Sequence, residues 1–383
     1  MKYTLDDLFV LGKRNGNKKR SYLLIDPLQA KHIPVSPSKA LEMFDSLGAQ
    51  LAAAYPTTGC IMGFAETATA VAAAAAMHFA PQTLYMQTTR ENVGDERNPF
   101  LLDFSEEHSH AVKQVLRTDF LAKQLKFNLL NDRPVMLIDD EISTGKTAAN
   151  AIGRLNERFP LLPRYISGYI IGSIINRMDA STREAYAAEG IDCASLVFAE
   201  TEGLEEKAAA FEIVPPAELP DVPAKEFENI KTEEKIPDLR RGGAFVHDMK
   251  MWFGRFSEEA YDLVKKKLPI SGRVLVMGTE ECMLPALLLG RLIEQRNKVE
   301  VYSHSTTRSP IGISTAEGYP IREGYKLSSF YEESRETFIY CPAEYDLVIV
   351  VTDSRNKEQS IRAMEDVTKV FGERVKRYIL LRG

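Results

Sequence analysis

The sequence has no apolar run of roughly 20 residues, the length that a helix needs to cross a bilayer. Its beginning, Met1–Arg20, is polar and basic and lacks the apolar centre of a signal peptide. We therefore expect a cytoplasmic protein without a membrane partner.

Cysteine is also scarce, with four residues that stand far apart at Cys60, Cys193, Cys282 and Cys341. No pair has zinc-knuckle spacing or indicates a disulfide framework, so the composition suits a reducing compartment. An excess of positive charge is missing too, because the formal net charge is −6. This argues against a nucleic-acid partner, although it leaves room for a local basic pocket around a small anion.

The 383 residues, 44% of them hydrophobic and 27% charged, are typical of a well-packed protein with two domains. We expect a first domain at 1–202, a linker rich in Glu, Lys and Pro at 203–242, and a second α/β domain at 243–383. The first domain alternates strand-like and helical stretches, which predicts a mainly parallel sheet. Its expected strands are Ser21–Ile25, Cys60–Met62, Thr83–Met86, Val135–Ile138, Tyr165–Ile175 and Ser195–Ala199.

The strongest local signal is Val135–Thr147, where an apolar strand leads into Asp139 and Asp140, then a short turn and a helix. A strand end projects the acid pair into the crevice where α/β proteins bind ligands. Adjacent carboxylates can accept hydrogen bonds from a vicinal diol, such as the ribose hydroxyls, and help to position Mg²⁺. The turn and helix start offer N–H groups and hydroxyls to a phosphate through Ser143, Thr144, Gly145, Lys146 and Thr147.

Two alternatives compete for this segment. Its end resembles a P-loop, but that motif needs a glycine five places before Gly145, where Asp140 would repel phosphates. The P-loop interpretation therefore fails. An acidic strand end that merely caps an ordinary helix is the other alternative, and the agreement of acid pair, turn and helix disfavours it.

The segment resembles the ribose-phosphate motif of type I phosphoribosyltransferases, and the turn after Cys60–Met62 resembles their pyrophosphate loop. That turn and the helix start after it include Gly63, Glu66, Thr67, Ala68 and Thr69. The whole chain resembles a group of bacterial proteins encoded with tellurite-resistance and stress operons, in which such a domain precedes a TRSP domain. Three further segments carry this resemblance: Lys31–Val35, Glu106–His110 and Thr307–Pro310.

The resemblance implies a type I phosphoribosyltransferase fold and a Mg²⁺-dependent enzyme of nucleotide metabolism. Such an enzyme transfers the phosphoribosyl group of 5-phosphoribosyl-1-pyrophosphate to a base-like or other small acceptor, here towards a nucleoside-like metabolite. Asp139 and Asp140 would hold the ribose and the Mg²⁺ that accompanies it. Arg90, which follows the strand Thr83–Met86, would neutralise the departing pyrophosphate, and a solvated surface arginine is the alternative. Ser143 stands where some purine-specific relatives carry an acid, which disfavours a hypoxanthine-type acceptor.

The stretch Glu91–His110 is a long loop with few apolar anchors, as expected of a lid. His108 and His110 could protonate the leaving pyrophosphate, since histidine titrates near neutrality. A helix-capping segment and a metal site are the alternatives, and the metal site lacks an obvious third ligand.

Two places could recognise the acceptor: Asn176 and Arg177 after the strand Tyr165–Ile175, or Lys31 and His32. A plain loop role is equally open for each. The sequence is compatible with a homodimer.

The second domain resembles a degenerate copy of the first. Order and spacing agree, because Gly63 to Asp139 spans 76 positions and Gly278 to Asp353 spans 75. The matching segments are Ile61–Glu66 with Val276–Glu281, Thr88–Arg90 with Thr306–Arg308, and Val135–Asp139 with Leu347–Asp353.

A real repeat would make Val274–Met277 and Leu347–Val351 neighbouring parallel strands. Their carboxyl ends would then bring a second candidate site together from Gly278, Glu281, Arg308, Ser309 and Asp353. The alternatives are an idle domain, and an Arg308 that only pairs with Asp353 or Glu281 to fix its loop.

Two functions of other classes remain open besides the transferase. One is a non-catalytic sensor of phosphoribosyl pyrophosphate, and the other is a scaffold that recruits partner enzymes. The pyrophosphate-loop segment and the lid histidines favour the enzyme over the sensor.

Overall fold

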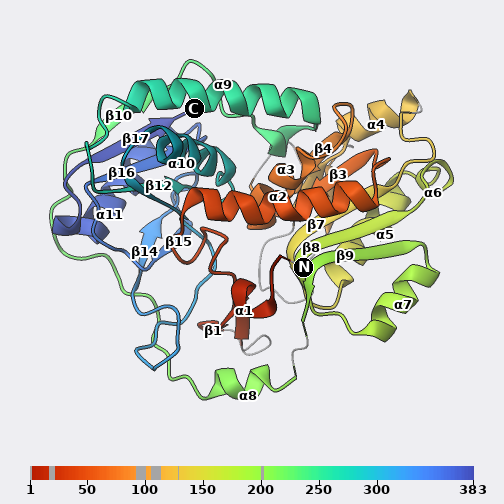
Figure 1. The fold of residues 1–383 in the computed structure, drawn as a ribbon, viewed down its shortest axis with the longest axis horizontal. Coiled ribbons are helices and arrows are strands. Elements are labelled where there is room, and N and C mark those ends of the chain that lie inside the picture. The colour runs from red at the N-terminus through yellow and green to blue at the C-terminus, as the bar shows by residue number, and fades with distance from the viewer. Residues whose placement is uncertain (1, 17–21, 92–100, 105–113, 128, 200–201) are drawn as a thin grey trace. The chain divides into compact units, whose positions relative to one another are not determined.

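The computed structural model describes residues 2–16, 22–91, 101–104, 114–127, 129–199 and 202–383 (Figure 1). The chain forms two compact units that interleave along the sequence. Unit 1 comprises Met1–Leu5, Met43–Thr201 and Pro237–Met251, and unit 2 comprises Asp6–Glu42, Glu202–Ile236 and Trp252–Gly383. The linear division expected at residues 202 and 242 therefore differs from the units of the structure.

A six-stranded sheet forms the centre of unit 1, in the order β11-β4-β3-β7-β8-β9. All neighbouring strands run parallel except β11, which is antiparallel to β4. This confirms the mainly parallel α/β fold. The strands are β3 Cys60–Gly63, β4 Leu84–Gln87, β7 Val135–Ile142, β8 Tyr169–Asn176, β9 Ile191–Phe198 and β11 Ala244–Phe245.

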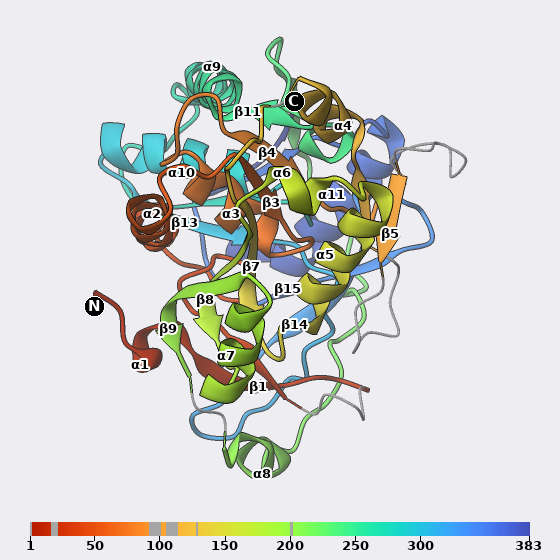
Figure 2. The same ribbon diagram turned by 90° about the vertical axis from the view of Figure 1, so that its right-hand side faces the viewer.

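Helices cover this sheet because its strands are apolar on both faces. Val135 and Leu137 of β7 share a buried core with Leu155 of α5, while Gly172 of β8 lies against Leu51 of α2 on the opposite face. Helix α7 packs beside β9 (Figure 2). The remaining elements are α2 Pro37–Ala54, α3 Ala68–Ala76, α4 Asp119–Lys126, α5 Lys146–Arg158, α6 Leu162–Tyr165, α7 Ala180–Ala188, the 3₁₀ turn η1 Leu239–Arg241, and the hairpin β5 Leu101–Phe104 with β6 Gln114–Arg117.

Unit 2 has a five-stranded, fully parallel sheet in the order β10-β17-β16-β12-β13. Strands β12 and β16 are direct neighbours, so the predicted pairing of Val274–Met277 with Leu347–Val351 is confirmed. The strands are β10 Glu228–Lys231, β12 Arg273–Gly278, β13 Glu300–Ser305, β16 Leu347–Thr352 and β17 Tyr378–Arg382.

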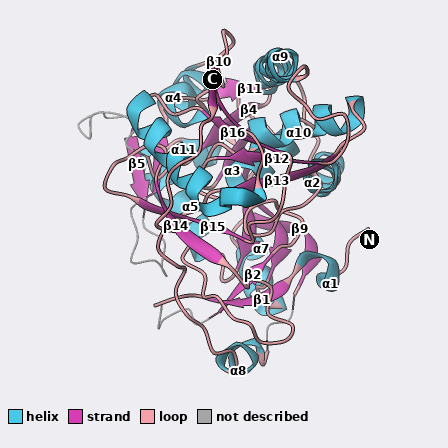
Figure 3. Ribbon diagram, turned by 90° about the vertical axis from the view of Figure 1, so that its left-hand side faces the viewer, coloured by secondary structure: helices cyan, strands magenta, loops and turns pink. Residues whose placement is uncertain are grey.

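Successive residues of β12 face two different helices, as the two-residue period of a strand requires. Val274 and Val276 share a core with Leu289 of α10, whereas Leu275 shares another with Met364 of α11. Figure 3 shows α10 and α11 in cyan beside the magenta strands. The other elements are α1 Leu5–Leu8, β1 Val10–Lys13, β2 Tyr22–Ile25, α8 Leu204–Ala209, α9 Val246–Val264, α10 Leu284–Arg296, β14 Gly324–Ser328, β15 Glu336–Tyr340, α11 Lys357–Phe371 and η2 Gly372–Arg374.

The segment expected to be a linker contributes structure to unit 2. Strand β10 adds an edge to the sheet by pairing with β17. Val214 and Ile313 exchange two backbone hydrogen bonds of 2.9 and 2.8 Å. Paired backbone explains why this Pro-rich stretch is ordered despite its weak strand periodicity.

His304 of β13 is a buried, neutral group in unit 2. Its Nε2–H donates to the carbonyl oxygen of Tyr340 at 2.7 Å, and burial lowers its pKa from 6.5 to about 4. Because the pKa is depressed on folding, His304 contributes full stability above pH 6.5, which is lost as the pH falls towards 4.

In the wild type, this proton should make the unfolding free energy rise by a value on the order of 3 kcal/mol between pH 4 and 6.5. We expect this rise to be smaller in His304→Gln, which has no imidazole to titrate. Urea titrations at a series of pH values measure it. The same slope in both proteins would contradict the assignment of this proton to His304.

Candidate functional site

The carboxyl ends of β3 and β7 meet at one edge of the unit 1 sheet. Gly63, the last residue of β3, lies opposite Ile138 of β7, and Asp139 follows directly. The loop after β3 and the acid pair are therefore brought together on neighbouring strands, where open α/β sheets bind ligands.

The acid pair lies within β7 rather than after it, because this strand continues to Ile142. Asp139 is paired with Ser173 of β8, and the backbone N–H of Asp140 donates to Asp139 Oδ1 at 2.9 Å. Both carboxylates are partly exposed. They can thus present oxygen acceptors at the sheet edge while their backbone stays fixed by strand pairing.

The turn after β7 ends in a glycine that no other residue could replace without strain. Gly145 has φ +76°, and a Cβ there would lie 2.6 Å from Met178 Sδ. Helix α5 begins at Lys146, whose N–H donates to Thr144 Oγ1 at 3.4 Å, and its N-cap residue Gly145 has no side chain to cap the N–H groups that follow. Its first N–H groups and its dipole suit a phosphate. Ser143 and Thr144 lie in this turn and Thr147 lies in the first turn of α5, and all three are at least partly exposed.

The loop between β3 and α3 is closely packed. A Cβ at Gly63 would lie 2.6 Å from Ala72 Cβ and 2.8 Å from Tyr85 Oη, so glycine is required there. The Thr69 hydroxyl donates to the Glu66 carbonyl at 3.0 Å, which commits it to the loop itself. Glu66 is 5% exposed, and Thr67 precedes Ala68 at the start of α3.

A ring of hydrogen bonds that the sequence did not indicate holds this loop. The Ala65 N–H donates to Thr88 Oγ1 at 2.8 Å, the Thr88 hydroxyl donates to Gln114 Oε1, and Gln114 Nε2 donates to the Ala65 carbonyl at 3.0 Å. Gln114 stands 49 positions from Ala65, so no local pattern could have revealed it. Arg90 follows Thr88 by two residues and is partly buried, while His108 and His110 lie outside the described residues.

The acceptor candidates after β8 serve local structure. Asn176 is fully buried, and its Oδ1 accepts from the Met178 N–H at 2.9 Å. Arg177 forms an ion pair with Glu141 of β7, in which both side chains are at most 14% exposed. Asn176 and Arg177 thus lie beside the acid pair, and their contacts fix the ends of β7 and β8.

Lys31 and His32 belong to unit 2, not to the unit that carries the acid pair. The chain before α2 runs antiparallel to β13 through Val35 and Ser303, which exchange hydrogen bonds of 3.1 and 2.7 Å. The His32 ring lies edge-on to Tyr340 of β15, 6.1 Å between centroids. They lie within the range expected for the first domain, but pairing of this stretch with β13 places them in unit 2.

The two sheets share the order of four strands. The order β4-β3-β7-β8 of unit 1 matches β13-β12-β16-β17 of unit 2, whereas the edge strand β9 follows β8 in the chain and the edge strand β10 precedes β12. The Glu280 N–H donates to Thr306 Oγ1 at 3.1 Å, as Ala65 does to Thr88. Thr307 bridges Phe338 of β15 just as Thr89 bridges Val115 of β6. These shared contacts support the predicted repeat.

Strand register corrects one detail of that repeat. Gly63 lies opposite Ile138, and continuing the pairing of Met277 with Val350 sets Gly278 opposite Val351. Asp353 therefore corresponds to Asp140, not to Asp139, whose equivalent is Thr352. Helix α11 also differs from α5, because Asn356 caps it by accepting from the Gln359 N–H at 3.1 Å. Unit 2 has lost one acid of the pair, and the N-cap residue of its helix caps it with a side chain, which the N-cap glycine of α5 cannot do.

The second candidate site does come together at the carboxyl edge of β12, but its own side chains fill it. Glu280 is 0% exposed and accepts from Arg308 at 2.7 Å, Arg335 at 3.0 Å and the Ser329 hydroxyl at 2.6 Å. Glu281 lies 3.7 Å from Arg308. Arg308 thus pairs most closely with Glu280, which the sequence did not indicate, and at a longer distance with Glu281, which it did.

The other predicted members of this site also form hydrogen bonds within the protein. Asp353 accepts from the Tyr331 hydroxyl at 2.7 Å, and the carbonyl of Ser309 accepts from the Tyr340 hydroxyl at 2.7 Å. The Gly278 carbonyl accepts from the Thr306 N–H at 3.2 Å. The arrangement favours the alternative in which Arg308 fixes its loop.

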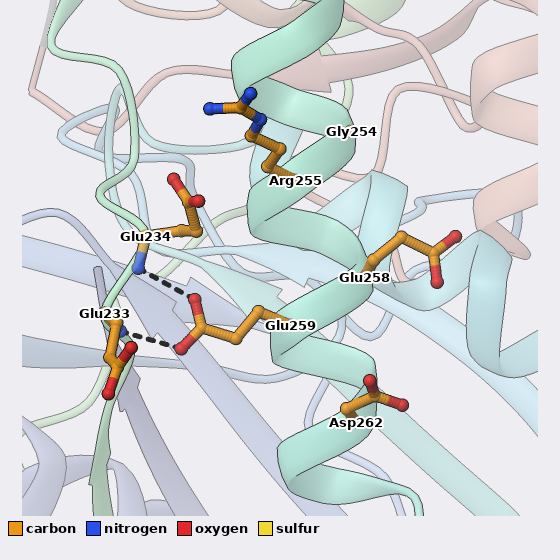
Figure 4. Close-up of a pocket in the computed structure, with 7 residues that line it drawn as sticks. All are labelled: Glu233, Glu234, Gly254, Arg255, Glu258, Glu259 and Asp262. Carbon is orange, nitrogen blue, oxygen red and sulfur yellow. Dashed lines mark hydrogen bonds between the residues drawn. The ribbon is translucent and has the colours of Figure 1, made fainter.

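A separate acidic groove of about 790 Å³ lies on unit 2 along α9 (Figure 4). Glu259 is committed to structure, because its carboxylate accepts from the backbone N–H groups of Glu233 and Glu234 at 2.7 and 2.8 Å.

Among the described residues, no group of three or more His, Cys, Asp or Glu side chains is arranged to hold a metal ion. None of the helices in the described ranges has the length and apolar character of a membrane span.

Comparison with known families gives two matches. A model described as phosphoribosyl transferase matches residues 8–201. A model of the TRSP domain, which lies C-terminal to that transferase domain, matches residues 244–368. None of the curated proteins that were compared matches the chain.

Several solved structures are similar to part of the chain. One is adenine phosphoribosyl transferase from Trypanosoma brucei in complex with AMP, pyrophosphate and ribose-5-phosphate, at 11% identity and TM-score 0.35, covering 52% of this chain and 80% of that one. Another is the enzyme from Giardia lamblia with 9-deazaadenine, at 16% identity and TM-score 0.34, covering 50% and 94%. Orotate phosphoribosyltransferase from Mycobacterium tuberculosis with inorganic phosphate has 15% identity and TM-score 0.28, covering 50% and 89%.

Proposed function

Because the chain belongs to the phosphoribosyl transferase family, we propose that unit 1 transfers a phosphoribosyl group from 5-phosphoribosyl-1-pyrophosphate to a small acceptor and releases pyrophosphate. The observation that carries this proposal is that the two segments proposed to bind anions meet on neighbouring strands. The loop after β3 and the β7–α5 segment adjoin through the pairing of Gly63 with Ile138. A ligand with a phosphate at one end and a pyrophosphate at the other suits such a pair.

In this proposal the β7–α5 segment holds the ribose phosphate. Asp139 and Asp140 accept hydrogen bonds from the ribose hydroxyls. The N-terminus of α5 binds the 5′-phosphate, where Gly145 lets the backbone approach closely.

The loop Gly63–Thr69 and Arg90 bind the pyrophosphate as it departs. Positive charge on the ribose ring in the transition state is stabilised by the nearby carboxylates, and no covalent intermediate is needed. On this basis catalysis comes from fixed geometry and charge. His108 and His110 stay predicted proton donors to the leaving group.

Mg²⁺ fits the donors of this edge. Asp139 and Asp140 supply the hard carboxylate oxygens that Mg²⁺ prefers, and a pyrophosphate would supply the rest. When bound, the ion would neutralise charge on the pyrophosphate. We propose that these two residues hold it together with the ligand.

A base-like acceptor other than a hypoxanthine-type purine is favoured, since Ser143 replaces the acid of purine-specific relatives. The product would then be nucleotide-like, which fits a cytoplasmic role in making a nucleoside-like metabolite under tellurite or other stress.

Incubation with phosphoribosyl pyrophosphate, Mg²⁺ and a metabolite extract tests the proposal. We expect new masses that carry a phosphoribosyl group, together with release of pyrophosphate. Binding of the ligand without turnover across all acceptors would instead favour the sensor, and absence of binding would favour the scaffold.

A further inference from the structure

The hydrogen-bond ring around Ala65 holds both backbone polar groups of this residue, which belong to two consecutive peptide units of the loop. Thr88 accepts from the Ala65 N–H, and Gln114 donates to the Ala65 carbonyl. That carbonyl shares its peptide plane with the N–H of Glu66. Gln114 therefore sets the direction in which the next N–H of the loop points.

Burial makes this ring effective. Gln114 is 2% exposed, Thr88 is 0% exposed and Ala65 is 6% exposed. Water cannot replace the lost partner at such a site, so a missing hydrogen bond there carries its full desolvation penalty. Thr89 and Val115 exchange two backbone hydrogen bonds of 2.9 Å, which hold β6 alongside the segment after β4.

The equivalent position in unit 2 does not make this link. Thr89 is bridged to Val115, and its counterpart Thr307 is bridged to Phe338. The residue before the bridged partner is Gln114 in unit 1 and Thr337 in unit 2, so these two positions are equivalent. The Thr337 hydroxyl lies 3.5 Å from the Leu327 carbonyl oxygen and 3.4 Å from that of Ser328, both in its own hairpin. The common fold thus forms without a glutamine at this place.

We propose that Gln114 is a positioning residue that orients the Ala65–Glu66 peptide for pyrophosphate. It contacts no substrate atom and acts through the loop. The inference rests on the proposed function of that loop.

Gln114→Glu tests it, because the two protonation states of the new side chain differ in one donor. The neutral acid can still donate to the Ala65 carbonyl and accept from Thr88, whereas the ionised form loses the donor. Burial in the ring raises the pKa of the new carboxyl above that of a free glutamate, so the neutral form is present near pH 5. We expect the affinity for inorganic pyrophosphate with Mg²⁺, relative to wild type at each pH, to fall at least about fivefold at pH 8 and to recover near pH 5. Ribose 5-phosphate, which binds the β7–α5 segment, should bind unchanged.

Thr88→Val provides a second variant of nearly the same shape without a new charge. It should weaken pyrophosphate binding at every pH and leave ribose 5-phosphate binding intact. The matched control is Gln359→Glu in unit 2, where a 4% exposed glutamine donates to the Ser329 carbonyl at 2.7 Å. The control should leave pyrophosphate affinity unchanged.

Three calorimetric outcomes would overturn the inference. Pyrophosphate affinity equal to wild type in Gln114→Glu at both pH values refutes it directly. Equal loss of both ligands reduces Gln114 to a general structural role. A wild type that binds ribose 5-phosphate but not pyrophosphate refutes the proposed loop function itself, and the inference with it.

Discussion

A chain in which Asp139 and Asp140 are both replaced by Asn is expected to bind phosphoribosyl pyrophosphate at least about tenfold more weakly, about 1.4 kcal/mol. Asparagine keeps the size of each side chain. It removes two negative charges and half of the acceptor oxygens that a ribose diol and Mg²⁺ require. Calorimetric titration with Mg²⁺ present measures the loss.

The turn before the same strand supplies a matched control. Asp132 is exposed, lies before the amino end of β7 and has φ +53°, a conformation that asparagine tolerates well. Asp132→Asn should therefore change neither stability nor affinity appreciably. A folded double variant at 139 and 140 with wild-type affinity would remove the ribose assignment.

Local sequence was sufficient to predict the edge of the unit 1 sheet. Apolar runs identified the strands, and the glycine turn identified the start of α5, because both depend on neighbouring residues. The end of β7 was less predictable. Polar residues from Asp139 to Glu141 continue the strand because β8 offers backbone partners as far as Asn176.

Contacts between distant segments could not be predicted in the same way. Gln114 is polar and unremarkable in sequence, and it becomes important only because β6 returns beside the loop after β3. Lys31 and His32 precede α2 in the chain, yet pairing of Val35 with Ser303 assigns them to unit 2. Such placements follow from tertiary pairing rather than from propensity.

The repeat was visible in order and spacing, but its alignment was wrong by one residue. Only the pairing of β12 with β16 shows that Asp353 takes the place of Asp140. A one-residue shift in a strand reverses the face of every side chain, so register decides which acid was retained. The retained acid is the one that accepts from Tyr331.

Loss of Glu280 should destabilise unit 2 more than loss of any exposed acid. Its carboxylate is 0% exposed and is the shared acceptor of Arg308 and Arg335, whose side chains are 11% and 15% exposed. Glu280→Ala leaves two largely buried guanidinium groups without the buried carboxylate that they share. Breaking one side of a buried ion pair costs about 3–5 kcal/mol, so a loss of about 3 kcal/mol in unfolding free energy is expected.

Glu332→Ala is the matched control, because Glu332 also accepts from Arg335, at 2.6 Å, but is 44% exposed. Solvent screening limits such a pair to about 0–1 kcal/mol. Urea titration followed by the fluorescence of Trp252, the single tryptophan of the chain and a residue of unit 2, compares the two variants. Equal urea midpoints for Glu280→Ala and Glu332→Ala would mean that the buried charge cluster does not stabilise unit 2. The carboxyl edge of β12 would then again be a candidate site for an external anion.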